Sequence, residues 1–593
     1  MNFEISTYLT KTGERGWGKC KECQKSVQWA KERVATHKRS SCLNTSEEVK
    51  RLFSKRKSDS NLHLSSTQRI INLDDSSSIN SNETEIENSK EDIDQKLANF
   101  FFRTGISLRL VESDAFKKFV QALNPTYSTT IPNAKTLSGP LLDKQFSKCS
   151  TILNDILETS ANLTLVSDGW TNIRGDHIVN FCIKAPEQKP FFYTSINTSG
   201  INQNASAVSA AVIEVIETLG PEKFCSFISD NAPVMRAAWK LIGERFPNIS
   251  THGCAAHAVN LLIKDIANTS ESSKIIKDAE KIIKFVKNHH IVKAKFDEKR
   301  LSANISHSLS MPVSTRWYSL YTSMNELYAL KYVLIQLFDE ESDIFKEIQP
   351  KATSTSVCSL IKSNTFWDRL LKLIKDIEYP TKIIGKLESD DASLSLVYKY
   401  FGDMYNFYDD PTILEKIKKR FDFLTSPVVG LAYILTPQNA AEGFFFNEDK
   451  TDIISSISEF ANKIDPLIAD KSENEMISFI AEMSLLPQKR KDVIFKMSAK
   501  QYWNILGRDK YPNLFRVISP IIHMISSSAI SERTWSTFRF IHSRLRNRLS
   551  NERVKKLVFM YTNSVLLDTA DKTDYILDEG ALLNEIECEE MSE

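Results

Sequence analysis

Residues 163–170 read LTLVSDGW, a short apolar stretch with β-branched residues that leads directly into an acid, Asp168. Two further stretches rich in β-branched and aromatic residues follow at 177–184 and 191–197. Runs of this composition, separated by Gly, Pro, Asn and Asp, are typical of β-strands. Because the three runs follow one another closely, we expect consecutive strands to pair as hairpins.

Helices and strands alternate after these three strands. Apolar residues at helical spacing predict helices over 205–219, 232–246 and 254–266, and strands are expected at 224–229 and 248–252. Alternation of strand and helix favours parallel pairing. The region 161–266 is therefore predicted to be an α/β core built on a mixed sheet.

The composition of the remaining chain divides it into further segments. A helical region is expected at 96–160, and residues 267–500 have a helical pattern almost throughout. Residues 44–95 are rich in Ser, Asn, Asp, Glu and Lys, and such a segment buries too little apolar surface to offset its ordering entropy, so we expect a flexible linker. A helical segment at 501–567 and an acidic tail at 568–593 complete the chain.

The net charge, the cysteine content and the length of the apolar runs limit what kind of protein this chain can be. The 593 residues carry a net charge of +1, so any contact with DNA must come from local basic patches. Nine cysteines, an odd number spread thinly along the chain, argue against a disulfide framework and favour a reducing compartment. No apolar run reaches the roughly 18 residues of a membrane helix. We expect an intracellular protein without a membrane segment, and the basic cluster at 50–57 favours the nucleus.

Residues 1–43 contain four side chains at the spacing of a zinc site. Cys20 and Cys23 are followed, after thirteen intervening residues, by His37 and then by Cys42. Two such pairs of borderline-soft ligands suit tetrahedral Zn²⁺, whereas the alternative is four unligated side chains near a disordered end. Basic residues that would contact DNA phosphates accompany the ligands: Lys19, Lys25, Lys38 and Arg39.

Two carboxylates mark the ends of two expected strands. Asp168 ends the first, and Asp230 ends the strand predicted at 224–229. Acids placed together at strand ends repel each other unless a cation lies between them, and hard oxygen ligands suit Mg²⁺ or Mn²⁺. The alternative for each residue is a turn or a helix cap, and Asp230 precedes Asn231-Ala-Pro233 as a capping residue would.

Several motifs resemble those of DNA transposases of the hAT superfamily, in the family's order along nearly the whole chain. The zinc spacing with its flanking tryptophans resembles a BED-type finger. Two acidic motifs of the family resemble residues 163–170 (LTLVSDGW) and 227–235 (FISDNAPVM). Its C-x-x-H motif resembles residues 254–262 (CAAHAVNLL), and its R-W motif resembles residues 314–317 (STRW). Its final acidic motif and the segment after it resemble residues 531–536 (SERTWS) and 544–549 (RLRNRL).

This resemblance implies an α+β multidomain protein. A small zinc finger would precede an RNase H-like α/β core that is interrupted by a large all-helical insertion, and the C-terminal helical segment would serve dimerisation. It implies a catalytic triad of Asp168, Asp230 and Glu532, of which Glu532 rests on the resemblance alone. The family's usual aromatic is Phe where this chain has Trp535, which we expect to fill an apolar pocket.

Other residues have two interpretations each. Cys254 and His257 are either metal ligands or side chains that pack one helix face against the sheet edge, with His257 near a scissile phosphate. Trp317, which follows Arg316, either belongs to a core or stacks on a DNA base displaced during cleavage. Basic residues after Glu532, among them Arg544 and Arg548, either form a solvated face or hold DNA phosphates, and an apolar stripe in the same region would suit an intertwined dimer: Leu545, Leu549, Val554, Leu557 and Val558.

Three functional hypotheses follow from these patterns. The first is an active transposase that binds its terminal inverted repeats, cuts phosphodiester bonds with two divalent ions and joins the ends to target DNA. Its partners would be double-stranded DNA and a second copy of itself, with structural Zn²⁺, catalytic Mg²⁺ or Mn²⁺ and no small-molecule substrate. The second is a domesticated, non-catalytic DNA-binding dimer. The third, a zinc-finger transcription factor with an unrelated helical body, leaves the acidic motifs unexplained.

Overall fold

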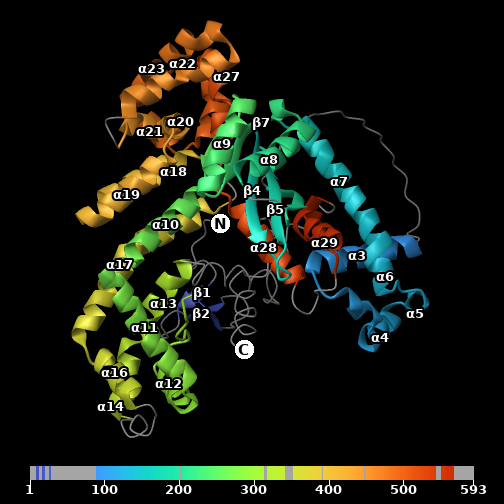
Figure 1. Ribbon diagram of the computed structural model, residues 1–593, viewed down its shortest axis with the longest axis vertical. Helices are drawn as coiled ribbons and strands as arrows, with labels where there is room; N and C mark the ends of the chain where they lie inside the picture. Colours follow the sequence, from blue (N-terminus) through green and yellow to red (C-terminus); the bar gives the residue numbers. More distant parts are fainter. Residues whose placement is uncertain are drawn as a thin grey trace. The chain divides into compact units, whose positions relative to one another are not determined.

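The computed structural model describes residues 9–11, 17–20, 26–28, 89–200, 204–312, 317–340, 351–389, 392–445, 449–542 and 549–566 (Figure 1). The chain forms two units, residues 1–86 and residues 87–593. In the first unit, three short strands make an antiparallel sheet in the order β1-β2-β3: β1 (Leu9–Lys11), β2 (Trp17–Cys20) and β3 (Ser26–Gln28).

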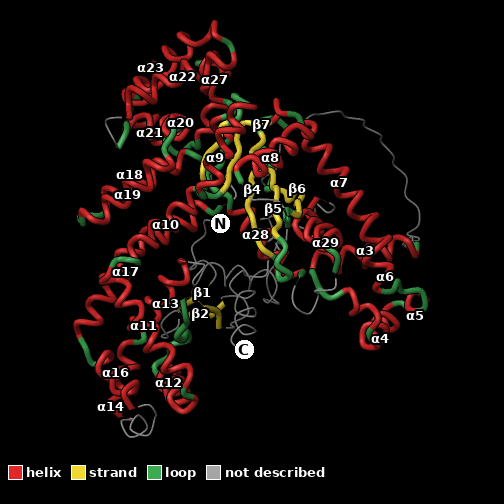
Figure 2. The backbone as a smooth tube through the Cα atoms, viewed as in Figure 1, coloured by secondary structure: helices red, strands yellow, loops and turns green. Residues whose placement is uncertain are grey.

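The second unit is built on a five-stranded mixed sheet of order β6-β5-β4-β7-β8, surrounded by helices (Figure 2). Its strands are β4 (Leu163–Thr171), β5 (His177–Lys184), β6 (Phe191–Asn197), β7 (Phe224–Ser229) and β8 (Ser250–Gly253). The first three pair antiparallel, as hairpins do, and β7 and β8 continue the sheet in parallel from β4. The directions expected from the sequence are therefore confirmed.

The two central strands are covered on both faces. Every residue from Leu163 to Ser167 is buried, and so is every residue of β7, because side chains alternate between the faces and both faces meet apolar neighbours. The expectation that this strand ends at Asp168 was wrong, because β4 continues to Thr171. Its parallel pairing with β7 stops at Val166, but its antiparallel pairing with β5 continues to His177.

Three helices lie close to their predicted bounds: α8 (Ala205–Leu219) connects β6 to β7, α9 (Pro233–Arg245) connects β7 to β8, and α10 (Ala255–Ala267) follows β8. The side chain of Asn204 caps α8, and Pro233 begins α9, where a missing backbone N–H has no cost. Before the sheet lies α7 (Leu142–Thr159), which follows a single π-helical turn, Leu137–Leu141, that contains Pro140.

The linker ends earlier than its composition predicts. Helix α3 (Lys90–Thr104) begins within the segment that was expected to be linker. The side chain of Ser89 caps its first turn, and the acidic side chains of Glu91 and Asp92 stabilise the positive end of the helix dipole. Shorter helices follow between α3 and α7: α4 (Asp114–Leu123), α5 (Pro125–Ser128) and α6 (Ala134–Thr136). Buried Asp94 accepts a hydrogen bond of 2.5 Å from the Tyr127 hydroxyl and joins α3 to α5.

The described residues between the sheet and the last helices form helices joined by loops, as expected. Its helices are α11 (Ser270–Asn288), α12 (His290–Ser302), α13 (Trp317–Ala329), α14 (Lys331–Glu340), α16 (Lys351–Ile361), α17 (Asn364–Leu387), α18 (Ser395–Phe407), α19 (Pro411–Leu424), α20 (Pro427–Ile434), α21 (Pro437–Glu442), α22 (Asp449–Ile464), α23 (Ala469–Leu485) and α24 (Gln488–Ile494). Helix α10, which leads out of the sheet, packs against both α17 and α19.

The chain then returns to the sheet. Short helices α25 (Ala499–Tyr502), α26 (Arg508–Lys510) and α27 (Pro512–Ile518) lead to α28 (Ala529–Ile541), which packs against β4 and β5. The last described helix, α29 (Asn551–Asn563), packs against β6, α7 and α28. Three residues of the apolar stripe predicted for a dimer, Val554, Leu557 and Val558, are instead buried within this chain itself. Leu549 is half-buried, and Leu545 lies outside the described residues.

The loop before α28 is held from two directions. On one side, Ser526 accepts a backbone hydrogen bond from Ala255, and the His252 ring bonds the carbonyl oxygen of Ile525. On the other side, Ser393 pairs with Ile525, and the backbone N–H of Ser526 donates to Ala392. The loop therefore joins the end of β8 to the helical insertion. No helix in the described part of the chain has the length and apolar character to cross a membrane.

Candidate active site

Two acids lie just beyond the point where the parallel pairing of β4 and β7 ends. Val166 of β4 pairs with Ile228 of β7, and each strand reaches its aspartate two residues later, at Asp168 and Asp230. Burial of the Asp168 carboxyl group and the negative charge of Asp230 raise the pKa of Asp168 to about 7, from the usual 3.8. The parallel register thus creates a pair of carboxylates that a cation would stabilise.

The carboxylate of Asp168 is held by two donors. Its Oδ2 accepts a hydrogen bond of 3.0 Å from Nε1 of Trp535, and its Oδ1 accepts one of 2.9 Å from the backbone N–H of Gly169. Both bonds favour the ionised form and lower the pKa of Asp168, against the larger upward effects of burial and Asp230. Each carboxylate oxygen keeps a second lone pair for another partner.

A fully buried amide links the same acid to α28. The backbone N–H of Asp168 donates to Oδ1 of Asn180 at 3.2 Å, and Nδ2 of Asn180 donates to the carbonyl oxygen of Ser531 at 3.2 Å. Ser531 directly precedes Glu532. Asn180 therefore connects the first acid of the predicted triad to the backbone beside the third.

Glu532 lies in the first turn of α28 and is exposed. An acid at this position is favoured by the positive end of the helix. Its charge contributes to the raised pKa of Asp168 and to that of buried Cys254, so the helix brings it towards the other acids. Among the described residues, no three His, Cys, Asp or Glu side chains are grouped closely enough to hold a metal ion as they stand.

Of the two alternatives that the sequence left open for Asp230, the structure shows the turn and not the helix cap, because α9 begins after Ala232 without a side-chain cap. Oδ1 of Asp230 accepts a hydrogen bond of 3.1 Å from the backbone N–H of Ala232, just before α9 begins. The neighbouring Asn231 is buried, and its Nδ2 donates to the carbonyl oxygen of Cys254 at 3.0 Å. The turn that positions Asp230 is thus attached to the start of α10.

Three family models match the parts of the chain that carry these residues. A domain of unknown function (DUF659) matches residues 132–282, which hold Asp168 and Asp230. The ZBED1 RNase-like helical domain matches residues 252–363, and the hAT family C-terminal dimerisation region matches residues 475–564, which hold Glu532. The chain is a hAT-family transposase-like protein. A comparison with curated proteins found no match.

The matched C-terminal region supports self-association of this transposase-like protein. It includes exposed apolar side chains on α23 and on the π-helical turn after α25, among them Leu485 and Ile505, which are 82% and 65% exposed. These differ from the buried stripe on α29, which has its partners within the chain.

The cysteine of the C-x-x-H motif connects α10 to the loop before α28. Its Sγ accepts hydrogen bonds from the backbone N–H groups of His257, at 3.4 Å, and of Ser528, at 3.3 Å. The thiol also lies 3.7 Å from the Ser527 hydroxyl. This arrangement agrees with the packing interpretation of Cys254. His257 is half-buried, which lowers its pKa, and the charge of Asp230 partly opposes that effect.

Sequence reasoning missed two residues that hold the site together. Trp535 does fill an apolar pocket, beside Trp170 and Phe538, but it also donates to Asp168. The replacement of the family's usual Phe by the one large aromatic residue with an N–H donor is a signal that could have indicated this. Asn180 had no such signal, because a polar residue within a predicted strand does not reveal its partner.

Several predicted site residues of the transposase-like protein lie outside the described residues. Of the zinc ligands, only Cys20 is described; it is buried at the end of β2. Trp317 begins α13, and Lys19 lies in β2, but nothing is described of either side chain. The other predicted ligands and DNA contacts are all outside: Cys23, Lys25, His37, Lys38, Arg39, Cys42, Arg316, Arg544 and Arg548.

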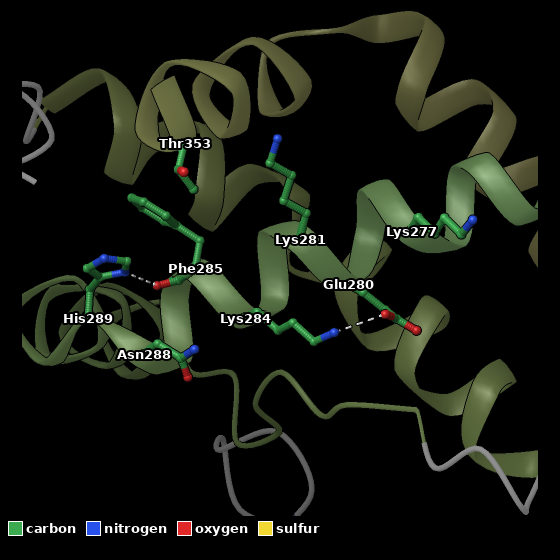
Figure 3. A pocket seen from close by; sticks show the side chains of 8 residues that line it. All are labelled: Lys277, Glu280, Lys281, Lys284, Phe285, Asn288, His289 and Thr353. Carbon is green, nitrogen blue, oxygen red and sulfur yellow. Dashed lines mark hydrogen bonds and ion pairs between the residues drawn. The ribbon is translucent and has the colours of Figure 1, made fainter. Parts of the chain in front are cut away.

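A basic groove of about 350 Å³ lies between α11 and α16 in the helical insertion (Figure 3). Lys277, Lys281 and Lys284 line it from successive turns of α11. Lys284 forms an ion pair with Glu280, and Lys281 donates to the Ser356 hydroxyl. None of the three predicted catalytic acids lines this groove.

Proposed function

We propose that this protein is a transposase that cuts and rejoins DNA strands with divalent ions held by Asp168, Asp230 and Glu532. The parallel register of β4 and β7 carries the proposal, because it places two acids together and raises the pKa of one of them. The sheet order, with three antiparallel strands followed by two parallel ones, supports an RNase H-like core.

The donor set fits Mg²⁺ or Mn²⁺, which prefer carboxylate oxygens. Two such ions would activate the attacking water or 3′-hydroxyl and stabilise the leaving oxygen of an in-line displacement. The protein's own part is to orient the Asp168 carboxylate through hydrogen bonds from Trp535 and Gly169, which favour its ionised form. Asn180 keeps the strand that carries Asp168 in register with the helix that carries Glu532.

A strand-cleavage assay tests this function. A DNA duplex with the element's own ends is incubated with the full-length protein and Mg²⁺ or Mn²⁺, and Asp230→Asn is compared with Asp509→Asn. Asp509 is an exposed acid on α26. We expect cleavage by the wild type and by Asp509→Asn, and none by Asp230→Asn. Tight DNA binding without cleavage by any of them would refute the enzyme and favour a domesticated DNA-binding dimer.

We further propose that Cys20, Cys23, His37 and Cys42 hold a zinc ion and that the finger binds DNA in the nucleus. The buried position of Cys20 at the end of β2 is consistent with a ligand inside a small module. Elemental analysis of the purified full chain should find one equivalent of zinc, which Cys23→Ser should lose. A full equivalent of zinc in the variant would exclude this ligand set.

A further inference from the structure

Trp535 connects the strand of one proposed catalytic acid, Asp168, to the helix of another, Glu532. It lies on α28 three residues after Glu532, so the two side chains share one side of the helix. Its indole N–H reaches across to the strand and donates to Oδ2 of Asp168 at 3.0 Å. The bond therefore joins the first acid to the helix that carries the third.

The indole ring is fixed by its neighbours. Trp535 is only 6% exposed, its ring centroid lies 5.3 Å from that of Trp170, and Phe538 lies 5.1 Å away on the same helix. A buried ring that packs against two other aromatic rings loses little freedom when it donates a hydrogen bond, so its N–H is a preorganised donor. A bond from a buried donor to a charged carboxylate is among the stronger kinds in proteins.

We propose that Trp535 is a positioning residue that orients the Asp168 carboxylate for divalent-ion binding. The inference rests on the proposed function, because it assigns the indole to the metal site of that reaction. Side chains that hold a metal ligand from behind fix its orientation and strengthen the metal's binding. Phenylalanine would fill the same pocket without the donor, so the two roles of the ring can be separated.

Two variants separate the packing role of the indole ring from its role as a hydrogen-bond donor. Trp535→Phe removes the N–H and keeps most of the packing, whereas Trp170→Phe removes a similar indole from the same cluster without a hydrogen bond to Asp168. Mn²⁺ binding to the full-length protein is measured by electron paramagnetic resonance of the free ion, without DNA. The thermal unfolding of each variant is followed in parallel without metal.

We expect Trp535→Phe to weaken Mn²⁺ binding by about 10-fold or more, as the loss of a supporting hydrogen bond does at other metal sites. Trp170→Phe should bind Mn²⁺ within about 2-fold of the wild type. Both variants should stay folded, and Trp535→Phe should lose more thermal stability than Trp170→Phe, because Trp535 is more buried and also loses its hydrogen bond to Asp168. Equal Mn²⁺ affinities for both variants would overturn the role of Trp535.

Asp168→Asn separates this result from the proposed function. If the wild type binds Mn²⁺, Asp168→Asn abolishes that binding and Trp535→Phe leaves it intact, only the role of Trp535 is refuted. If the wild type and Asp168→Asn bind Mn²⁺ equally or not at all, the proposed metal site fails, and the inference about Trp535 fails with it.

Discussion

Gly253 is required because a neighbouring side chain occupies the space of a Cβ atom. A Cβ built on Gly253, at the end of β8, would lie 1.7 Å from Oδ1 and 2.9 Å from Cγ of Asn231. Asn231 is buried and donates to the carbonyl oxygen of Cys254, so it cannot move without breaking that bond. The strand end and the Asp230 turn therefore fit together only when residue 253 has no side chain.

The cost of Gly253→Ala follows from two contributions. Forcing an extra methyl group into a packed site costs about 1 to 3 kcal/mol. Loss of the hydrogen bond of Asn231 adds about 0.5 to 1.5 kcal/mol. We expect the free energy of unfolding to fall by about 1.5 to 4.5 kcal/mol, a large share of the roughly 5 to 15 kcal/mol that stabilises a typical domain.

Urea titration followed by tryptophan fluorescence measures this loss, with Gly243→Ala as a matched control. Gly243 lies inside α9 with no atom within 4 Å of an added Cβ, so alanine there should stabilise the helix by about 0.5 to 1 kcal/mol.

A second substitution makes the reasoning refutable. In an Asn231→Ala background both clashing atoms are gone, and Cη2 of Trp239, at 3.1 Å, is the next contact. The penalty of Gly253→Ala should then fall below about 1 kcal/mol. If the two single penalties instead add within about 0.5 kcal/mol, the contact with Asn231 is not the reason for glycine at this position.

Three further predictions concern ionisation, packing and assembly. Because the folded state raises the pKa of Asp168, protonation of this acid stabilises the fold fully below about pH 4, and the stabilisation is lost as pH rises through about 7. In metal-free buffer, the melting temperature of Asp168→Asn should therefore rise relative to that of the wild type between these pH values. Parallel plots of melting temperature against pH for the two proteins would contradict this. Buried Asn563 bonds both the N–H and the carbonyl oxygen of Phe192, and Asn563→Ala should cost about 2 to 6 kcal/mol in urea titrations, whereas a loss below about 0.5 kcal/mol would show these bonds to be dispensable. Ile505→Glu should weaken self-association in sedimentation experiments without lowering thermal stability, and Phe119→Glu, an exposed change outside the matched dimerisation region, should leave association intact; equal effects of both would argue against this surface.

Local patterns predicted the sheet and its connections well. The bounds expected for β5, β6, β7 and α8 agree with those observed, because each has the composition or the helical spacing of its type and ends at or just before turn-forming residues. The onset of α3 was missed because a short polar helix start resembles a linker in composition, and only the cap at Ser89 distinguishes it. The extent of β4 depended on its pairing with β5, which a single strand's pattern does not contain.

The site was less accessible to sequence reasoning than the fold. Asp168 and Asp230 could be chosen because each comes just after an apolar run with the composition of a strand. Glu532 could be chosen only through a family resemblance, since its first-turn position on α28 has no pattern that separates it from other acids. The contacts of Trp535 and Asn180 join residues hundreds of positions apart, and no local rule predicts such pairs.

The late arrival of α28 and α29 has a consequence during synthesis. The strands β4, β5 and β6 leave the ribosome long before the two helices that pack on them, and Phe192 of β6 meets Phe538 and Phe559 only once those helices exist. Until then, apolar surface of the nascent sheet lacks its final cover and is prone to aggregation or chaperone capture. A premature stop within the helical insertion therefore removes both the last acid and the cover of the sheet, so a shortened product should be cleared rather than persist as a folded, inactive competitor.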